Sequence, residues 1–326
     1  MTKRYQAIVG VVLGLCISAC LPLAVRGQQQ PFRVVGYYSL KAAMEKPKDV
    51  PFKYLTHINL WFLNPDSLGR FTTDFSALKP FIDKAHKKNI RVLFSIGGGS
   101  KQPQYMRLLQ DDLRPKLIDS LVAQVIRNNL DGIDVDLEGS DIHDTYESFV
   151  VELANALHAK GKLITSAVAI YYKDQFTDKA LAQYDFMNVM SYDRTGPWRP
   201  DKPGPHALYT HAVEDLNYFG EERKIAPEKM TLGVPFYGYG YGPELTSPAI
   251  SMGYKKIVET FKGAENVDEW RMPDGKILYY NGIPTIRLKT KLAMDKASGI
   301  MIWEVRSDAK GKKSLLRAIH EAAKGK

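Results

Sequence analysis

Cysteine is nearly absent from this sequence, because the 326 residues contain only two, Cys16 and Cys20, both near the N-terminus. The body of the chain therefore has no cysteine for a disulfide framework or a thiolate metal site. Internal repeats and Pro/Ser/Thr-rich linkers are also missing. With 44% hydrophobic and 11% aromatic residues, the composition excludes a disordered or collagen-like chain and is typical of a globular protein.

Acidic residues are outnumbered, with 36 Asp and Glu against 45 Lys and Arg and a net charge of +9. The lysine-rich spots at residues 84–88 and 310–313 lack the interleaved aromatic side chains that stack on nucleic-acid bases. A basic excess without that pattern is typical of a solvated surface. No nucleic-acid partner is therefore predicted.

The N-terminal segment has the pattern of a secretory signal. Lys3 and Arg4 precede an apolar stretch at residues 7–17, which is too short to remain in a membrane as a spanning helix. The next residues, Ile17-Ser18-Ala19-Cys20, resemble the bacterial lipoprotein box, in which processing leaves a lipidated cysteine as the first residue.

This resemblance predicts a lipoprotein-type signal peptide over residues 1–19, a lipid anchor on Cys20 and a tether over residues 20–31. Simple cleavage near Gly27 is the alternative. Lipidation would attach the mature protein by acyl chains instead of a helix. We expect export across an inner membrane and anchoring in a bacterial cell envelope, at the outer membrane or the cell surface.

The rest of the chain, residues 32–326, alternates short apolar runs with segments of helical period. This alternation indicates an α/β fold with a parallel sheet, and eight runs at this length favour a closed (β/α)8 TIM barrel. An open doubly wound sheet is the alternative. The expected strands are residues 34–39, 57–63, 91–96, 132–138, 163–170, 186–192, 231–238 and 299–304.

The connection between the last two expected strands, residues 239–298, is longer than one helix requires. It contains Trp270, a Pro273-Asp274-Gly275 turn and the strand-like residues 277–280. We therefore expect a small β-rich insertion between strands seven and eight, within a single barrel domain.

The fourth expected strand carries three acidic residues on one face. With a period of two, Asp134, Asp136 and Glu138 share a side. In a parallel strand covered by helices, the acidic side points into the barrel, where burial of carboxylates about 6.6 Å apart is costly and raises pKa values. Glu138 lies at the C-terminal end of the strand, the catalytic face of barrel enzymes, and is suited to protonate a leaving group.

Metal binding is the rival explanation for three clustered carboxylates. However, successive inward positions of one strand stack along it instead of converging, and no histidine lies near in the sequence to complete a site. We predict no metal and no cofactor.

The acidic strand is part of a longer pattern. Residues 131–138, which read Asp-Gly-Ile-Asp-Val-Asp-Leu-Glu, resemble the DGxDxDxE signature of glycoside hydrolase family 18, the chitinases and their relatives. Four more elements resemble motifs of that family and occur in its order, at residues 95–98, 190–193, 233–238 and 301–304. The resemblance therefore covers nearly the whole body of the chain.

The resemblance implies a retaining mechanism in which the 2-acetamido group of the substrate is the nucleophile. In that mechanism Glu138 would be the acid and then the base, Asp136 would bind the acetamido N–H, and Asp134 would tune Asp136. Tyr192 would hold the acetamido oxygen, and Asp193 would complete the acetamido pocket. The partner would be a glycan that contains N-acetylglucosamine.

Aromatic residues after strand ends predict a sugar-binding cleft, because the apolar faces of pyranose rings stack on such side chains. Trp303 matches the tryptophan that lies under the substrate sugar in the family. The expected substrate-binding residues are Asp193, Met190, Trp303, Trp198, Tyr237, Tyr38, Trp61 and Gly98.

The sequence departs from the family pattern in places. Residues 139–141 lack the aromatic that often follows the glutamate, and Tyr239 stands where several relatives carry arginine. We expect a monomer that cleaves chitin or chitooligosaccharides. An endo-β-N-acetylglucosaminidase acting on the chitobiose core of N-glycans and a non-catalytic glycan-binding lipoprotein remain as alternatives.

Overall fold

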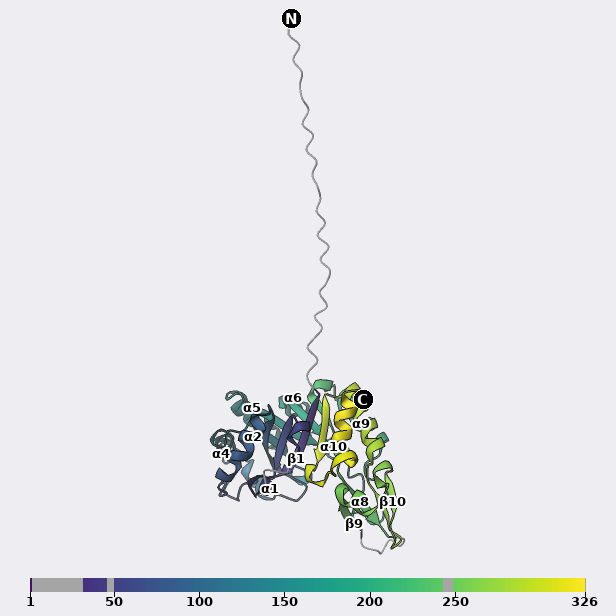
Figure 1. Cartoon of the computed structure of the whole chain (residues 1–326). Helices are drawn as coiled ribbons and strands as arrows, with labels where there is room; N and C mark the ends of the chain where they lie inside the picture. The colour runs from purple at the N-terminus through teal and green to yellow at the C-terminus, as the bar shows by residue number, and fades with distance from the viewer. Residues whose placement is uncertain (2–31, 46–49, 243–248, 326) are drawn as a thin grey trace. The chain divides into compact units, whose positions relative to one another are not determined.

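The computed structural model describes Met1 and residues 32–45, 50–242 and 249–325. Eight parallel strands form a closed barrel in the order β1-β12-β7-β6-β5-β4-β3-β2 (Figure 1). The strands are β1 Arg33–Ser39, β2 His57–Trp61, β3 Arg91–Gly97, β4 Gly132–Asp136, β5 Leu163–Val168, β6 Phe186–Val189, β7 Met230–Pro235 and β12 Gly299–Trp303. β12 pairs with both β1 and β7, so the predicted (β/α)8 barrel is confirmed and the open sheet is excluded.

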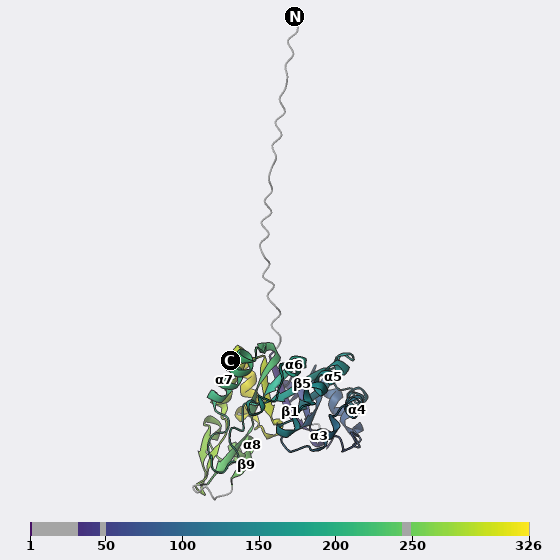
Figure 2. The ribbon, with the colours of Figure 1, turned by 180° about the vertical axis from the view of Figure 1, so that it is seen from behind.

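Helices cover the outside of the barrel, and Figure 2 shows neighbours such as α4, α5 and α6 beside one another. The bounds of the α-helices, including α8 of the insertion described below, are α1 Leu40–Glu45, α2 Lys79–His86, α3 Gln104–Leu108, α4 Arg114–Arg127, α5 Tyr146–His158, α6 Asp178–Gln183, α7 Tyr209–Asn217, α8 Tyr254–Thr260, α9 Ile283–Lys296 and α10 Leu315–Ala323. Apolar residues three and four positions apart form the buried stripe of each longer helix, as Phe149, Leu153 and Leu157 do in α5. Within the described ranges, no helix has the length and apolar character needed to cross a bilayer.

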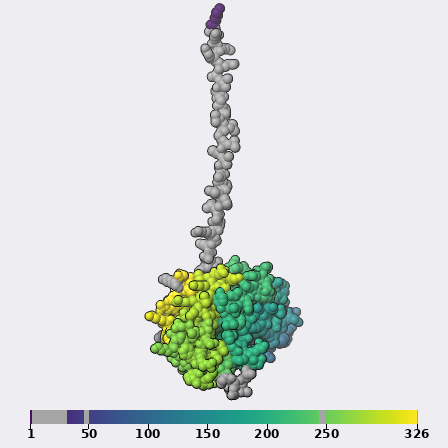
Figure 3. Space-filling model, turned by 90° about the vertical axis from the view of Figure 1, so that its right-hand side faces the viewer, coloured from purple at the N-terminus to yellow at the C-terminus, as the bar shows by residue number. Residues whose placement is uncertain are grey.

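The predicted insertion between the last two barrel strands is a four-stranded antiparallel sheet in the order β10-β11-β8-β9, together with α8. Its strands are β8 Tyr237–Tyr241, β9 Ile250–Gly253, β10 Glu269–Arg271 and β11 Ile277–Tyr279. The expected strand at residues 231–238 is therefore two strands, because β7 ends at Pro235 and β8 pairs with β9 and β11 instead of the barrel. In Figure 3 the light-green atoms of this segment lie beside the yellow C-terminal residues.

The barrel strands divide apolar and polar residues between their two faces. Ile133 and Val135 of β4 belong to the large core that packs between the strands and the helices. A second, smaller cluster of buried apolar residues includes Val35, Tyr37 and Met301, with Trp303 packed against it. The alternating residues of β4 that do not face the helices are the acidic ones, so the fold places carboxylates inside the barrel.

The helical shell generates a stability prediction. Leu153 of α5 is fully buried, whereas Leu288 of α9 is 52% exposed. We expect Leu153→Ala to lower the free energy of unfolding by about 2–5 kcal/mol, because it removes buried area and leaves a cavity. The matched control, Leu288→Ala, should change it by less than about 0.5 kcal/mol. Urea unfolding followed by circular dichroism measures both, and equal losses would contradict the packing described.

Candidate active site

The three carboxylates of the acidic strand lie in different environments at the C-terminal end of β4. Asp134 is fully buried and Asp136 is 2% exposed, whereas Glu138 is partly accessible. β4 ends at Asp136, two residues earlier than expected. Within the described residues, no group of three or more His, Cys, Asp or Glu side chains is arranged to hold a metal ion.

Asp134 is held by four side-chain donors from four other strands. Oδ2 accepts from the Tyr37 hydroxyl at 2.6 Å and the Ser95 hydroxyl at 2.8 Å. Oδ1 accepts from the Thr165 hydroxyl at 2.6 Å and the Asn188 amide at 3.2 Å. Burial raises the pKa of Asp134 above its usual value, and these four hydrogen bonds oppose that rise.

Asp136 has no such support. Its Oδ1 is buried and has no hydrogen-bond partner among the described residues. Burial raises the pKa of Asp136 well above its usual value, and the neighbouring charges of Glu138 and Asp134 add to the rise. A buried acceptor without a partner is costly. A hydrogen-bond donor that enters the pocket and binds this oxygen would remove that cost.

Glu138 faces the pocket and is suited to carry a proton at neutral pH. Burial raises its pKa from 4.5 to about 7, and the charges of Asp193 and Asp141 act in the same direction. The Tyr172 hydroxyl, 3.4 Å from Oε2, opposes the rise by donating to the carboxylate. A carboxylic acid with this proton affinity can donate and recover a proton near pH 7.

These side chains line a pocket of about 500 Å³, a size that suits small-molecule ligands. Seven of the predicted site residues are in its wall, namely Asp136, Glu138, Met190, Tyr192, Asp193, Trp198 and Trp303. The wall also contains Phe62, Gly99, Ala169, Tyr171, Tyr172, Arg194 and Arg199, which the sequence reasoning did not single out.

Tyr192 and Asp193 follow β6, which only β5 separates from β4 in the barrel order. The Tyr192 hydroxyl lies 3.8 Å from the sulfur of Met301, and burial raises the pKa of Tyr192 well above 10, so the phenol keeps its proton. Oδ1 of Asp193 accepts hydrogen bonds from the hydroxyls of Tyr237 at 2.5 Å and Tyr239 at 3.1 Å. Tyr237 thus contacts a pocket residue from behind without lining the pocket.

An aromatic cluster forms the floor beneath the pocket. The Trp303 ring lies 5.3 Å from Tyr37, 5.5 Å from Trp61 and 5.7 Å from Phe62, measured between centroids. Trp61 supports Trp303 and does not line the pocket itself. By contrast, Trp198 is 59% exposed and sits edge-on to Tyr239, which leaves most of its ring available for a ligand.

Two predicted binding residues lie elsewhere. Tyr38 is buried on the outer face of β1 and stacks on Phe81 of α2, so its assignment to the cleft is wrong; the alternation of the strand gives the inward position to Tyr37. Gly98 is buried with φ +100°, and a Cβ atom there would lie 2.3 Å from the Phe62 ring. Its role is to form the turn after β3.

The residues that sequence reasoning missed carried a usable signal. Tyr171 and Tyr172 are adjacent aromatics that follow the C-terminal end of β5, the same edge of the barrel as Glu138. Arg194 follows the matched motif at residues 190–193; its guanidinium donates to Asp215 at 2.5 Å and lies over the Tyr171 ring. Because the site of a barrel enzyme lies at the C-terminal ends of its strands, the position of these side chains just after strand ends is enough to predict them as site residues.

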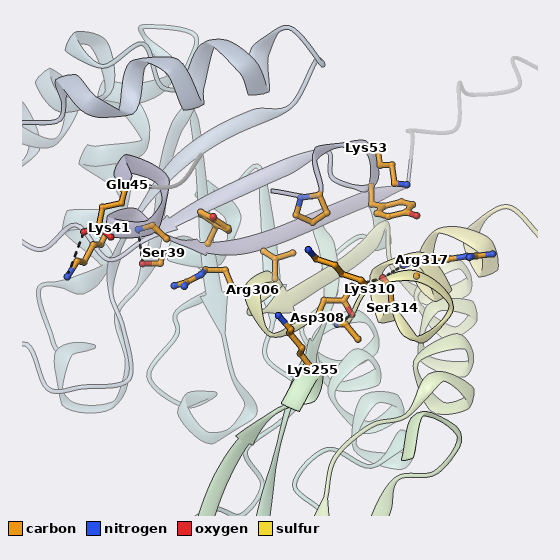
Figure 4. Close-up of a pocket in the computed structure, with 17 residues that line it drawn as sticks. Ser39, Lys41, Glu45, Lys53, Lys255, Arg306, Asp308, Lys310, Ser314 and Arg317 are labelled. Carbon is orange, nitrogen blue, oxygen red and sulfur yellow. Dashed lines mark hydrogen bonds and ion pairs between the residues drawn. The ribbon is translucent and has the colours of Figure 1, made fainter. Parts of the chain in front are cut away.

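A second, larger pocket of about 730 Å³ lies between α1 and the segment before α10 (Figure 4). Its rim is cationic, with Lys53, Lys255, Arg306 and Lys310 among its residues. Of its two carboxylates, Asp308 already accepts from the Ser314 hydroxyl and from backbone N–H groups at the start of α10, and Glu45 is paired with Lys41 at 3.8 Å. This pocket therefore presents no acid and base pair comparable to the one on β4.

Comparison with protein families and known structures gives a consistent result. The family model described as Glycosyl hydrolases family 18 matches residues 33–308. Among solved structures, the chain is similar to the GH18 chitinase ChiB from the chitin utilization locus of Flavobacterium johnsoniae, with 34% identity and a TM-score of 0.80, over 90% of this chain and 94% of that one. A chitinase from Bacteroides thetaiotaomicron is 28% identical, with a TM-score of 0.75, over 90% and 96% of the two chains.

Among curated proteins, the probable chitinase 10 of Drosophila melanogaster is 25% identical over 272 residues, or 64% of this chain. That alignment covers 12% of the Drosophila protein. The alignments with two further relatives, the chitinase-like mite allergen Der f 18.0101 of Dermatophagoides farinae and the probable chitinase 2 of Drosophila melanogaster, cover 44% and 57% of those proteins. The chain thus spans well under two thirds of these proteins.

The raised pKa of Glu138 predicts that the free energy of unfolding depends on pH. Because its pKa is raised from 4.5 to about 7, the folded state holds this proton more tightly than the unfolded chain does. The stabilisation is complete below about pH 4.5 and is lost as the pH rises through about 7, by up to about 3 kcal/mol. We expect the stability of Glu138→Gln relative to the parent protein to increase between pH 4 and pH 8.

Urea unfolding at both pH values measures this difference. The matched control is Glu45→Gln, because the side chain of Glu45 in α1 is 55% exposed. A Glu138→Gln stability difference that is the same at pH 4 and pH 8 would contradict the raised proton affinity of Glu138.

Proposed function

This chain belongs to glycosyl hydrolase family 18, and from that membership we propose that it is a retaining glycoside hydrolase of chitin or chitooligosaccharides. The observation that carries the proposal is Glu138, a pocket carboxyl whose pKa burial raises to about 7, two residues beyond Asp136, which has an oxygen without a partner. Together they offer a proton donor and a hydrogen-bond acceptor to the same bound sugar.

The first chemical step uses the substrate as its own nucleophile. Glu138 gives its proton to the glycosidic oxygen, and the bond from that oxygen to C1 breaks as the leaving sugar departs. The carbonyl oxygen of the 2-acetamido group attacks C1 and forms an oxazolinium intermediate. Water then attacks C1 with Glu138 as the base, which opens the ring, restores the acetamido group and returns the proton to Glu138.

The neighbouring residues bind and orient the acetamido group. The unpartnered Oδ1 of Asp136 accepts its N–H, which supports the positive charge of the intermediate. Asp134, fixed by four donors, keeps negative charge close to Asp136. Tyr192 remains a neutral phenol and donates to the acetamido oxygen, and Asp193 completes the pocket.

Chitin-type substrates are favoured by the aromatic surfaces. Trp303 at the floor and Trp198 at the exposed edge provide two faces for pyranose rings. The two structures most relevant to this point, at 34% and 28% identity, are both described as chitinases. We propose that the protein acts as a monomer.

The decisive experiment supplies two glycans and one variant. We expect the purified protein to release product from chitotetraose but not from a high-mannose glycoprotein, with kcat/KM falling as the pH rises above about 7 because Glu138 loses its proton. Glu138→Gln should reduce kcat by at least about 100-fold with its circular dichroism spectrum unchanged, since it removes the general acid.

Each other outcome identifies a different function. Cleavage of the glycoprotein alone would show an endo-β-N-acetylglucosaminidase. Binding of chitotetraose by calorimetry without turnover would show a non-catalytic glycan-binding protein. Parent-like rates in Glu138→Gln would disprove the mechanism.

We also propose that Cys20 carries a lipid that anchors the protein in the cell envelope; both cysteines lie outside the described residues. In a bacterial host, Cys20→Ser should move the protein from the membrane to the soluble fraction, because the acylated side chain is lost. Cys16→Ser is the matched control and should stay in the membrane fraction. Equal membrane retention of Cys20→Ser would refute the anchor.

A further inference from the structure

The two oxygens of the Asp193 carboxylate have different hydrogen-bond surroundings. Oδ1 receives three contacts, from the hydroxyls of Tyr237 at 2.5 Å and Tyr239 at 3.1 Å and from Nδ1 of His206 at 3.1 Å. No described residue donates to Oδ2, although Asp193 lines the pocket and its side chain is 31% exposed. The carboxylate is therefore fixed through one oxygen and open to a ligand through the other.

Both tyrosines must be donors in this arrangement, because an ionised carboxylate can only accept. Tyr237 and Tyr239 are the alternating residues of β8, so a rigid strand of the insertion aims two hydroxyls at the same oxygen. Within the described chain, no lysine or arginine lies within ion-pair distance of Asp193. The two tyrosine donors to Asp193 therefore bring no positive charge to it.

His206 supplies the third donor from a loop that is 13 residues further along the chain. Its Nδ1 lies 3.1 Å from Oδ1 of Asp193 and 3.4 Å from the Asp193 backbone nitrogen, and it cannot donate to the first and accept from the second at once. A proton on Nδ1 satisfies the shorter contact to the carboxylate. The ring is 1% exposed, and Nε2 has no hydrogen-bond partner among the described residues.

A buried lysine fixes the loop that carries His206. The carbonyl oxygen of Ala207 accepts from Nζ of Lys289 and from the Asn281 amide, each at 2.9 Å. Lys289 also donates to Oδ1 of Asn281 at 2.9 Å, and all three residues are buried. The residue that follows His206 is therefore held in place in part by α9, through Lys289.

Asp193 itself has a backbone that needs support. Its φ of +62° lies in the left-handed region, which residues other than glycine adopt infrequently and often at functional sites. The three contacts to Oδ1 hold the side chain of this residue in one orientation at the pocket wall.

We propose that His206 is a positioning residue which, with Tyr239, orients the Asp193 carboxylate so that Oδ2 binds the N-acetylglucosamine unit at the reacting position. This inference rests on the proposed function, because the ligand of Oδ2 is the sugar of that reaction. Tyr237 and Tyr239 fix the orientation of the carboxylate from the insertion, and His206 fixes it from the loop after β6.

The test measures kcat and KM for chitotetraose with His206→Ala and His206→Asn. Loss of one hydrogen bond to a charged group reduces kcat/KM by about tenfold or more, whereas the Asn side chain can donate to Asp193 and recovers most of that loss. Tyr239→Phe removes another donor and has an effect of similar size even if His206→Ala fails to fold. Tyr254→Phe is the matched control, because this buried hydroxyl donates to the Lys313 carbonyl outside the pocket and its loss leaves kcat/KM unchanged.

A second measurement separates binding from chemistry. In the Glu138→Gln background, the His206→Ala change should weaken the binding of chitotetraose by calorimetry by about tenfold. Parent-like kcat/KM in both His206→Ala and Tyr239→Phe would overturn the positioning role alone, as would equal losses in His206→Ala and His206→Asn. A parent protein that neither cleaves nor binds chitotetraose would overturn the proposed function and this inference together.

Discussion

A carboxylate buried at the centre of a barrel must be surrounded by hydrogen-bond donors. Asp134 is such a carboxylate, and the arrangement of the strands has to bring its donors together. Its four donors come from β1, β3, β5 and β6, through Tyr37, Ser95, Thr165 and Asn188. Only a closed barrel brings these strands around one point, because β1 and β6 are far apart in the strand order. Loss of these donors would leave a charge in a site that cannot hydrate it.

The same burial separates the three carboxylates into different chemical states. Asp136 lies between the other two, and the charges of Glu138 and Asp134 discourage its ionisation in addition to burial. Asp134 is satisfied by the protein, Asp136 has an oxygen that the protein does not satisfy, and Glu138 lies at the pocket with a pKa raised to about 7. One strand thus presents a fixed charge, an acceptor and a proton donor in sequence.

The sequence predicted the site residues that follow from the two-residue alternation of a strand or from a short motif. Alternation along β4 placed Asp134, Asp136 and Glu138 inside the barrel, and the matched motifs placed Tyr192 and Asp193 at its mouth. Alternation puts the adjacent Tyr37 and Tyr38 on opposite faces of β1, and the contact with Asp134 identifies Tyr37 as the inward one, so the prediction of Tyr38 is wrong. The contact of His206 with Asp193 depends on how a loop folds back and on Lys289 from a distant helix, which no local pattern encodes.

In the proposed reaction, the tyrosine donors on Asp193 connect the binding of the sugar to the chemistry of the acid. The charge of Asp193 is one of the causes that raise the pKa of Glu138. A lysine or arginine on Asp193 would offset that charge and weaken its effect on Glu138. Tyr237, Tyr239 and His206 fix the carboxylate by hydrogen bonds while Tyr237 and Tyr239 contribute no positive charge, so the orientation of Asp193 is secured and its field at Glu138 is retained. Tyrosine donors at residues 237 and 239 therefore favour the protonated form of Glu138, which is the form that starts the proposed reaction.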